Sequence, residues 1–286
     1  MYKLTVQNHL NERLQLTQNP SYAVTDIDGL NPPKSNINMG ENANFDGATY
    51  ASSKMNTRQI TITVMPLNNV EKNRIALYQF FKSKKEVTLF FENGSRSVYI
   101  VGYVSAFECD LFSTNGKGER AQITIICPDP YFRSTNSGEV IFSTTIPRFI
   151  FEMDIPEEGV VFSELTDTAE TQVVNQGDAD TGMIIEMHAT GNATNPTIYN
   201  VDTGEQMKLN ISLIEGDSVF INTNKGHKSI TLVRGGTVTN ILNALDLYTS
   251  TWLQLDSGVS NLTFVAESGE DNIECQIVYD TLFEGV

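Results

Sequence analysis

The chain has 286 residues, close to the roughly 250–300 at which a single hydrophobic core stops growing, so two domains are expected. Its net charge of −16, from 35 acidic and 19 basic residues, opposes stable binding to nucleic acid, which requires clustered Lys and Arg to displace counterions. No stretch approaches the ~20 apolar residues of a membrane span, and the N-terminal residues lack the apolar run of a signal peptide. We therefore expect no membrane insertion and a chain made in the cytoplasm.

Strand patterns dominate the sequence. In residues 58–64, RQITITV, the apolar Ile60, Ile62 and Val64 alternate with threonines, which is the period of a half-buried strand. The same alternation recurs in SVYIVGYV (97–104), AQITIIC (121–127), MKLNISLI (207–214) and NIECQIVY (272–279). These patterns predict a mainly β protein.

One helix is expected, in residues 67–86 (LNNVEKNRIALYQFFKSKKE). Its apolar stripe consists of Val70, Leu77, Tyr78 and Phe81. Such a stripe is typical of a helix that packs one side on a core, and the lysines that follow Phe81 favour the carbonyl pole of the helix dipole. We therefore expect a helix that covers a sheet.

A strand pattern ends abruptly at the sequence Pro-Asp-Pro-Tyr-Phe. Proline donates no ladder hydrogen bond and fixes φ, so Pro128 and Pro130 together end the strand. Tyr131 and Phe132 can then fold back as apolar anchors, and the polar residues that follow are typical of a crossing between domains. An ordinary strand end with exposed aromatic side chains is the alternative. We place the domains at 1–133 and 134–286, with the junction motif Asp129, Pro130, Tyr131 and Phe132.

Turn sequences recur about every ten residues after the junction, without a strong helix pattern, and this spacing predicts an antiparallel sandwich. The sequence RGGT at 234–237 is interpreted as a hairpin turn. The residues from 237 to 252 are interpreted as a loop or short helical turn, because β-branched residues flank the apolar positions.

No arrangement of residues predicts an enzyme. The histidines are His9, His188 and His227, of which His188 lies in a strand pattern, and no serine lies in G-x-S-x-G. Asp178 and Asp180 begin like a calcium loop, but glycine occupies the third ligand position and no glutamate the twelfth. We expect no catalytic residue, no cofactor and no metal site. A cell-wall hydrolase, which would need two carboxyls facing each other across a cleft, is the less favoured alternative.

Three cysteines, Cys109, Cys127 and Cys275, are widely separated in apolar, strand-like segments. Their odd number and spacing suggest neither a disulfide framework nor a metal knuckle. We expect three buried thiols.

A binding signal lies in the aromatic residues of the second half. Trp252, Tyr248 and Tyr199 could form a platform on which a sugar ring stacks. A lone tryptophan beside Leu253 and Leu255 is more often a core residue. A carbohydrate-binding module that contacts a cell wall is therefore kept as a second hypothesis.

Several segments, taken in order, resemble the distal tail protein family of siphovirus-type bacteriophages or prophages of Gram-positive hosts. The resemblance covers nearly the whole chain, and its sharpest point is Asp-Pro-Tyr-Phe at 129–132. The segments in the first half are TDIDGLNPPKSNINMG, TRQITITVMPL, ALYQFFKSKKEVTLFF, VYIVGYVSAFECD and ERAQITIICPDPYF. Those in the second half are VVNQGDADTGMIIEM, PTIYNVDTGEQMKLN, GDSVFINTNKG and IECQIVYDTLFEGV.

The resemblance implies an N-terminal, ring-forming β-sandwich or split-barrel-like domain with one α-helix, followed by a galectin-like antiparallel β-sandwich. It implies a structural hub at the virion tail tip, where a hexameric ring joins the major tail tube protein to the tail-tip fibre or tail-associated lysin protein. A receptor-binding protein is a further candidate neighbour. No long insertion interrupts the second half, as occurs in relatives with an extra carbohydrate-binding module, so direct receptor binding is not implied.

The extended segment 28–47, DGLNPPKSNINMGENANFDG, gains a role from the resemblance. It is long and polar enough to be an arm or belt that reaches a neighbouring copy. A disordered surface loop is the alternative.

Overall fold

The computed structural model describes residues 2–41, 46–110, 119–142, 145–147, 163–165 and 171–286. It contains two compact units, one made of Met1–Thr135 with Leu282–Val286 and the other of Asn136–Thr281. The last five residues belong to the first unit, whereas the sequence placed them in the second domain. They do so because Phe283 packs against the first hydrophobic core. The division at 133/134 into separately folding domains stays a prediction.

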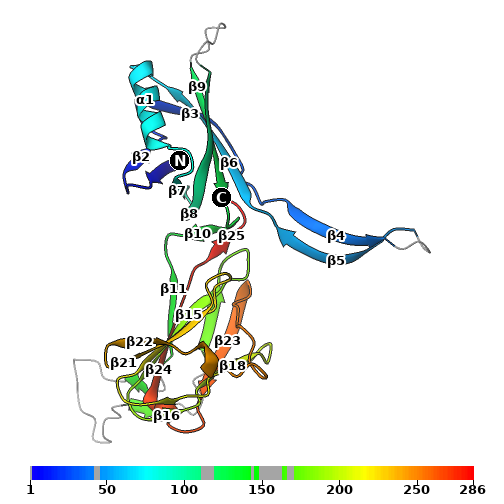
Figure 1. The fold of residues 1–286 in the computed structure, drawn as a ribbon, viewed down its shortest axis with the longest axis vertical. Helices are drawn as coiled ribbons and strands as arrows, with labels where there is room; N and C mark the ends of the chain where they lie inside the picture. Colours follow the sequence, from blue (N-terminus) through cyan, green and yellow to red (C-terminus); the bar gives the residue numbers. More distant parts are fainter. Residues whose placement is uncertain (1, 42–45, 111–118, 143–144, 148–162, 166–170) are drawn as a thin grey trace, which may run out of the picture. The chain divides into compact units, whose positions relative to one another are not determined.

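The first unit is built on one antiparallel sheet (Figure 1). Its strand order is β2-β1-β7-β8-β9-β6-β3, and β10 pairs with both β8 and β25. The alternation predicted for residues 58–64 is present, since Ile60, Ile62 and Val64 are buried in β6. The strands of this unit are β1 (Lys3–Asn8), β2 (Arg13–Gln15), β3 (Tyr22–Asp28), β4 (Ser35–Glu41), β5 (Ala48–Met55), β6 (Arg58–Pro66), β7 (Glu86–Glu92), β8 (Ser97–Asp110), β9 (Arg120–Cys127), β10 (Phe132–Ser134) and β25 (Leu282–Phe283).

The predicted helix is α1 (Val70–Phe80), which contacts β6. Leu77 and Phe81 are buried as expected, but Tyr78 is 40% exposed and packs edge-on against Phe107. The helix ends before the lysines, so the expected dipole interaction in its last turn is absent. The chain turns away because Lys84 has a positive φ of 65° and donates its backbone N–H to Val104 of β8.

The second unit contains a six-stranded and a four-stranded antiparallel sheet. Their orders are β11-β24-β15-β20-β21-β22 and β14-β23-β17-β18, and two further two-stranded pairs are β12-β13 and β16-β19. The strands are β11 (Gly138–Phe142), β12 (Thr145–Pro147), β13 (Ser163–Leu165), β14 (Thr171–Asn175), β15 (Met183–Ala189), β16 (Ala193–Thr194), β17 (Thr197–Asn200), β18 (Gln206–Lys208), β19 (Ser212–Leu213), β20 (Ser218–Asn222), β21 (Ser229–Arg234), β22 (Thr237–Asn240), β23 (Gly258–Val265) and β24 (Ile273–Tyr279). The 3-10 turns are η1 (Leu242–Ala244) and η2 (Glu270–Asn272).

The hairpin turn predicted at RGGT joins β21 to β22. Gly235 and Gly236 have φ values of 55° and 78°, the positive pair that a tight hairpin of this hand requires. The expectation for the next residues is corrected in part, because Thr237–Asn240 is a strand and only Leu242–Ala244 is a helical turn. The turn at Gly235 and Gly236 reverses the chain, so that β22 pairs with β21 before the helical turn at Leu242 begins.

Each unit has a hydrophobic core of its own. The first is formed by apolar side chains of β1, β6, β7, β8, β9 and α1, and the second by the facing sides of the two larger sheets. Cys127 and Cys275 are buried, but Cys109 is only half-buried, which corrects the expectation of three buried thiols. The mainly β fold class with one α-helix is confirmed for the part of the chain that the structure describes. No helix in that part is long and apolar enough to cross a membrane.

Candidate functional site

The arm, as we name the hairpin of β4 and β5, projects away from the sheet of the first unit (Figure 1). Every residue of β4 is exposed, and in β5 only Met55 is partly covered. Among the described strands, β4 and β5 pair only with each other. Each strand therefore has one edge that pairs with no other described strand, and such an edge is a template for pairing with another chain.

The arm carries an apolar face. Ile37, Met39 and Tyr50 are 51%, 58% and 61% exposed. Met39 lies opposite Tyr50 in the register, and Ile37 lies two residues before Met39, so the three side chains share one face. On the other face, Asn38 Nδ2 donates to Ser52 Oγ at 2.9 Å. The described residues of segment 28–47 thus contain an ordered strand with an uncovered apolar surface.

The junction motif is held inside the first unit. Asp129 accepts a hydrogen bond from the backbone N–H of Tyr131 at 3.2 Å and forms an ion pair with Arg133 at 2.9 Å. Phe132 is fully buried and meets the ring of Phe91 edge-on at 5.5 Å. Tyr131 is half-buried. The fold-back of an aromatic anchor is therefore seen at Phe132.

A buried arginine that the sequence reasoning missed completes the junction. Arg58 is 3% exposed, lies over the ring of Phe132 at 4.5 Å, and donates from Nε to the carbonyl of Pro130 at 2.6 Å. The sequence contained a signal for it. Arg58 stands at the inward-facing end of the alternation that continues with Ile60, so its side chain had to be buried.

The three aromatic residues proposed for glycan stacking lie in different settings. Trp252 packs against the second core, with the Lys228 ammonium 5.1 Å from its ring centroid. Tyr199 is half-buried in β17, and Tyr248 is fully exposed. Within the described residues no ring contact joins any two of them. Their role in binding stays a prediction.

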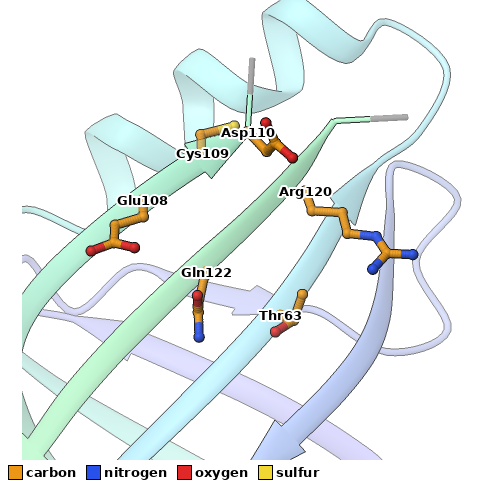
Figure 2. A pocket seen from close by; sticks show the side chains of 6 residues that line it. All are labelled: Thr63, Glu108, Cys109, Asp110, Arg120 and Gln122. Atoms are coloured by element: carbon orange, nitrogen blue, oxygen red, sulfur yellow. The ribbon is translucent and has the colours of Figure 1, made fainter. Parts of the chain in front are cut away.

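An open polar cleft of about 460 Å³ lies where β8 ends and β9 begins (Figure 2). Glu108 and Asp110 of β8 stand opposite Gln122 and Arg120 of β9. Figure 2 shows Glu108, Gln122 and Thr63 on the near side of the sheet, each from a different strand. The carboxylates and the guanidinium of this cleft can form ion pairs with charged groups of a partner. No histidine is among the residues that line the cleft.

Cys109 also lines the cleft, yet it is a weak nucleophile. Burial raises the pKa of its thiol, and the opposing effect of its hydrogen bond with Tyr78 is smaller. The thiol is therefore protonated at neutral pH, whereas nucleophilic attack requires the thiolate.

The other residues considered for chemistry lie apart. His188 is in β15, as predicted for a sheet residue, with Nδ1 3.0 Å from Ser218 Oγ. The described residues contain no group of three or more His, Cys, Asp or Glu side chains that could hold a metal ion. The expectations of no catalytic residue, no cofactor and no metal stay predictions.

Two family profiles match the chain. One is described as a phage tail protein RIFT-related domain and matches residues 12–127. The other is described as the C-terminal domain of a siphovirus-type tail component and matches residues 176–283. Together they take in well over half of the chain. A search of curated proteins found no match.

Two solved structures share the fold over nearly the whole chain. The SPP1 Dit (gp 19.1) protein, described as a paradigm of the hub adsorption apparatus in Gram-positive-infecting phages, is 15% identical with a TM-score of 0.67, over 98% of this chain and 99% of that chain. A chain of the phage P2 baseplate, solved in its activated conformation with calcium, is 10% identical with a TM-score of 0.51, over 100% of both chains. At such identities the likeness shows the fold alone.

Proposed function

The chain belongs to the siphovirus-type distal tail protein family, and from this premise we propose that six copies form a ring that is the structural hub of a phage tail tip. The ring joins the major tail tube protein to the tail-tip fibre or tail-associated lysin protein. The support for the hub role is the match of both halves of the chain to tail-component families. The support for a ring is the arm.

The arm suits contact with a second copy of the chain. A two-stranded hairpin by itself is marginally stable in water, and strand edges that no other described strand covers favour association. The exposed face of Ile37, Met39 and Tyr50 adds apolar surface that a neighbour would remove from water. We therefore assign the ring-forming surface to the first domain, predicted as 1–133. The galectin-like sandwich, predicted as 134–286, takes no part in the contact between copies.

Oligomeric state tests this proposal. Light scattering or native mass spectrometry of the full chain should give about six copies. The double variant Met39→Asp and Tyr50→Asp should shift the population towards monomer, because two charges would lie in the contact. The control is Leu247→Asp with Tyr248→Asp, which changes one aliphatic residue and one tyrosine that are 80% and 101% exposed in the second unit. A monomeric wild-type chain contradicts the ring.

Neighbours in the particle follow from the hub role. The major tail tube protein should bind one side of the ring and the tail-tip or tail-associated lysin protein the other, with a receptor-binding protein as a further partner. Co-expression of these proteins followed by affinity purification would test each contact.

We place the assembled protein at the virion tail tip, after synthesis in the cytoplasm of a host bacterium. The similarity to SPP1 Dit, a hub protein of Gram-positive-infecting phages, favours a Gram-positive host.

A carbohydrate-binding module is the second candidate, because the ring of Tyr248 is fully exposed and that of Tyr199 is partly exposed. Binding of cell-wall glycans by the full chain on a glycan array, lost in Tyr248→Ala, would favour it. A cell-wall hydrolase is the third class. Clearing of peptidoglycan in a zymogram would favour that class against our proposal of a non-enzymatic hub without cofactors.

A further inference from the structure

The last five residues return to the first unit after the whole of the second unit has been built. Strand β25 pairs antiparallel with β10, with Phe132 opposite Phe283 and Arg133 opposite Leu282. The chain therefore enters the second unit after β10 and returns from it into β25, and these two strands pair with each other in the first unit. In Figure 1 the C-terminus lies beside β6, close to where the arm begins.

Arg58 binds four backbone carbonyl groups at this place. Its Nη1 donates to Gly29 and Asn31 at 2.6 and 2.8 Å, and its Nη2 donates to Glu284 at 2.6 Å. The fourth acceptor is Pro130, which receives Nε at 2.6 Å. Arginine suits this position because its planar guanidinium presents five donors in a fixed fork, which a lysine ammonium cannot do.

These carbonyls belong to segments that meet at the root of the arm. Gly29 and Asn31 lie between β3 and β4, where the chain enters the arm, and Arg58 begins β6 directly after the chain leaves it. Pro130 is in the junction motif, and Glu284 is in the C-terminal tail. One buried side chain thus ties the entry and exit of the arm to the tail.

A second set of contacts fastens the tail to the same place. Arg96 Nη1 donates to the carbonyl of Gly285 at 2.8 Å, and its guanidinium lies over the ring of Phe283 at 4.4 Å. The backbone N–H of Val286 donates to the carbonyl of Leu30 at 3.3 Å, and the Val286 side chain packs against the first core. The tail therefore touches the arm root directly as well as through Arg58.

We infer that residues 282–286, Arg58 and Arg96 form a clamp that fixes the root of the arm, so that assembly through the arm depends on residues 282–286. The physical reason is that the arm has no other described support, since β4 and β5 pair only with each other. Its direction is set where it joins β3 and β6. The consequence for assembly rests on the proposed ring, whereas the ordering of the root does not.

Two variants of the full chain test the clamp. Removal of residues 284–286 deletes the Glu284 carbonyl, the Gly285 carbonyl and the Val286 amide while it keeps β25. Arg58→Lys keeps the charge but cannot reach four carbonyls. The matched control is Arg13→Lys, because Arg13 also stacks on an aromatic ring of this sheet, at 5.0 Å from Phe90, but lies away from the tail.

Hydrogen exchange gives the readout for the root. In both variants we expect amides of β3 and of the start of β6 to exchange about tenfold faster or more, as local opening requires, while amides of β14 and β23 are unchanged. Light scattering on the same samples should show loss of the oligomer. The control should match the wild type in both measurements.

The outcomes separate the clamp from the ring. Unchanged exchange at the root in a folded variant overturns the clamp, and faster exchange with an intact oligomer overturns its role in assembly. If the wild type is a monomer, the ring fails while the exchange result still decides the clamp. If the shortened chain fails to fold, the exchange measured in Arg58→Lys decides whether the clamp exists. If the shortened chain and Arg58→Lys both fail to fold while Arg13→Lys folds, the tail is required for folding of the whole unit, and a local clamp is overturned.

Discussion

Single residues in the junction explain why a strand ends on two prolines and two aromatics. Pro128 and Pro130 stop the ladder of β9, and the carbonyl of Pro130 becomes an acceptor for Arg58. Phe132 then enters the first core, where it meets Phe91 and the Arg58 guanidinium. The junction is an anchor in the first unit and not a free linker.

Truncation of Phe132 measures that anchor. Phe132→Ala should lower the free energy of unfolding by about 3–5 kcal/mol, because a fully buried aromatic leaves a cavity. Phe132→Leu should cost clearly less, since most of the volume remains. Chemical denaturation followed by circular dichroism would measure both. Equal stability of the alanine variant and the wild type would contradict the anchor.

A buried carboxylate in the second unit predicts acid sensitivity. Asp217 is 1% exposed and accepts hydrogen bonds from Arg234 Nε and from the backbone N–H of Ile214, both at 2.9 Å. The hydrogen bonds from Arg234 hold the pKa of Asp217 below its usual 3.8. The ionised form is therefore favoured in the folded state, and its contribution to stability is present above about pH 4 and lost as the pH falls through the lowered pKa.

Asp217→Asn should separate this effect from general acid unfolding. The variant should unfold at a lower temperature at pH 7, because Arg234 loses its charged partner. The difference from the wild type should shrink as the pH falls below 4 and through the lowered pKa, because the native carboxylate then becomes protonated. Glu215→Gln, next to the same turn, is the control. Thermal melts at several pH values would check the trend, and a difference that grows in acid would contradict it.

Among the elements, the arm depends on a tight turn at its root. Gly29 has a φ of 89°, and a Cβ at this position would lie 2.1 Å from the carbonyl oxygen of Gln59 in β6. Gly47, which directly precedes β5, has a φ of 100°, but no atom of the described residues lies within 4 Å of where a Cβ would be. A side chain would strain the left-handed backbone at both positions, and the two positions differ in the space available for it.

This pair gives a matched prediction. Gly47→Ala should cost about 1–2 kcal/mol, the cost of a left-handed backbone with a side chain. Gly29→Ala should cost at least about 1–3 kcal/mol more, because β3 or β6 must shift to relieve the overlap. Denaturant titrations of both variants would compare them. Equal costs would show that the root of the arm yields easily, against the clamp.

Elements with a clear period could be predicted from the sequence, and elements without one could not. The alternation of Ile60, Ile62 and Val64 identified β6, and the glycine pair identified the β21–β22 turn. Strand β25 has two residues and therefore no period, and its partner β10 is far away along the chain. Helical spacing placed Tyr78 on the buried stripe, but packing left it at the edge beside Phe107.

At the scale of the whole molecule, the candidate site was predictable only in part. The chemistry of Pro128 and Pro130 predicted the junction motif, and the family resemblance supported the arm, because both are continuous in sequence. The clamp unites Gly29, Arg58, Arg96, Pro130 and Glu284, whose meeting depends on tertiary pairing that no local pattern encodes. The inward position of Arg58 was the one local sign of it.

Proteolysis should reveal the connection made by the tail. Residues 133–138 are exposed or half-buried, and the exposed, polar Thr135, Asn136 and Ser137 connect β10 to β11, so limited digestion should cut within Arg133–Gly138. Denaturing gels should then show two fragments. Native gel filtration should still show one species, because the C-terminal fragment carries β25, which remains paired with β10. Fragments that separate at once would contradict this pairing, and cuts confined to residues 26–50 would contradict the boundary.

The charge of the chain leads to a prediction about the assembled ring. If six copies enclose a channel through which a phage genome leaves, a basic lining would hold the DNA through counterion release and slow its exit. The net charge of −16 per chain favours an acidic or neutral lining, along which DNA slides. We therefore expect no binding of double-stranded DNA at low salt, about 50 mM, where electrostatic attraction is strongest.

A gel shift with a duplex of random sequence measures this directly, with the isolated oligomer and a salt series. A shift at low salt that fades as salt is added would reveal a basic track that the net charge conceals, and the conduit would then need another explanation. A surface that is acidic only for solubility would also fail to bind DNA. Lysines placed on a surface that lines the channel should slow the exit of DNA, whereas lysines placed elsewhere on the ring should not, because only the lining faces the DNA.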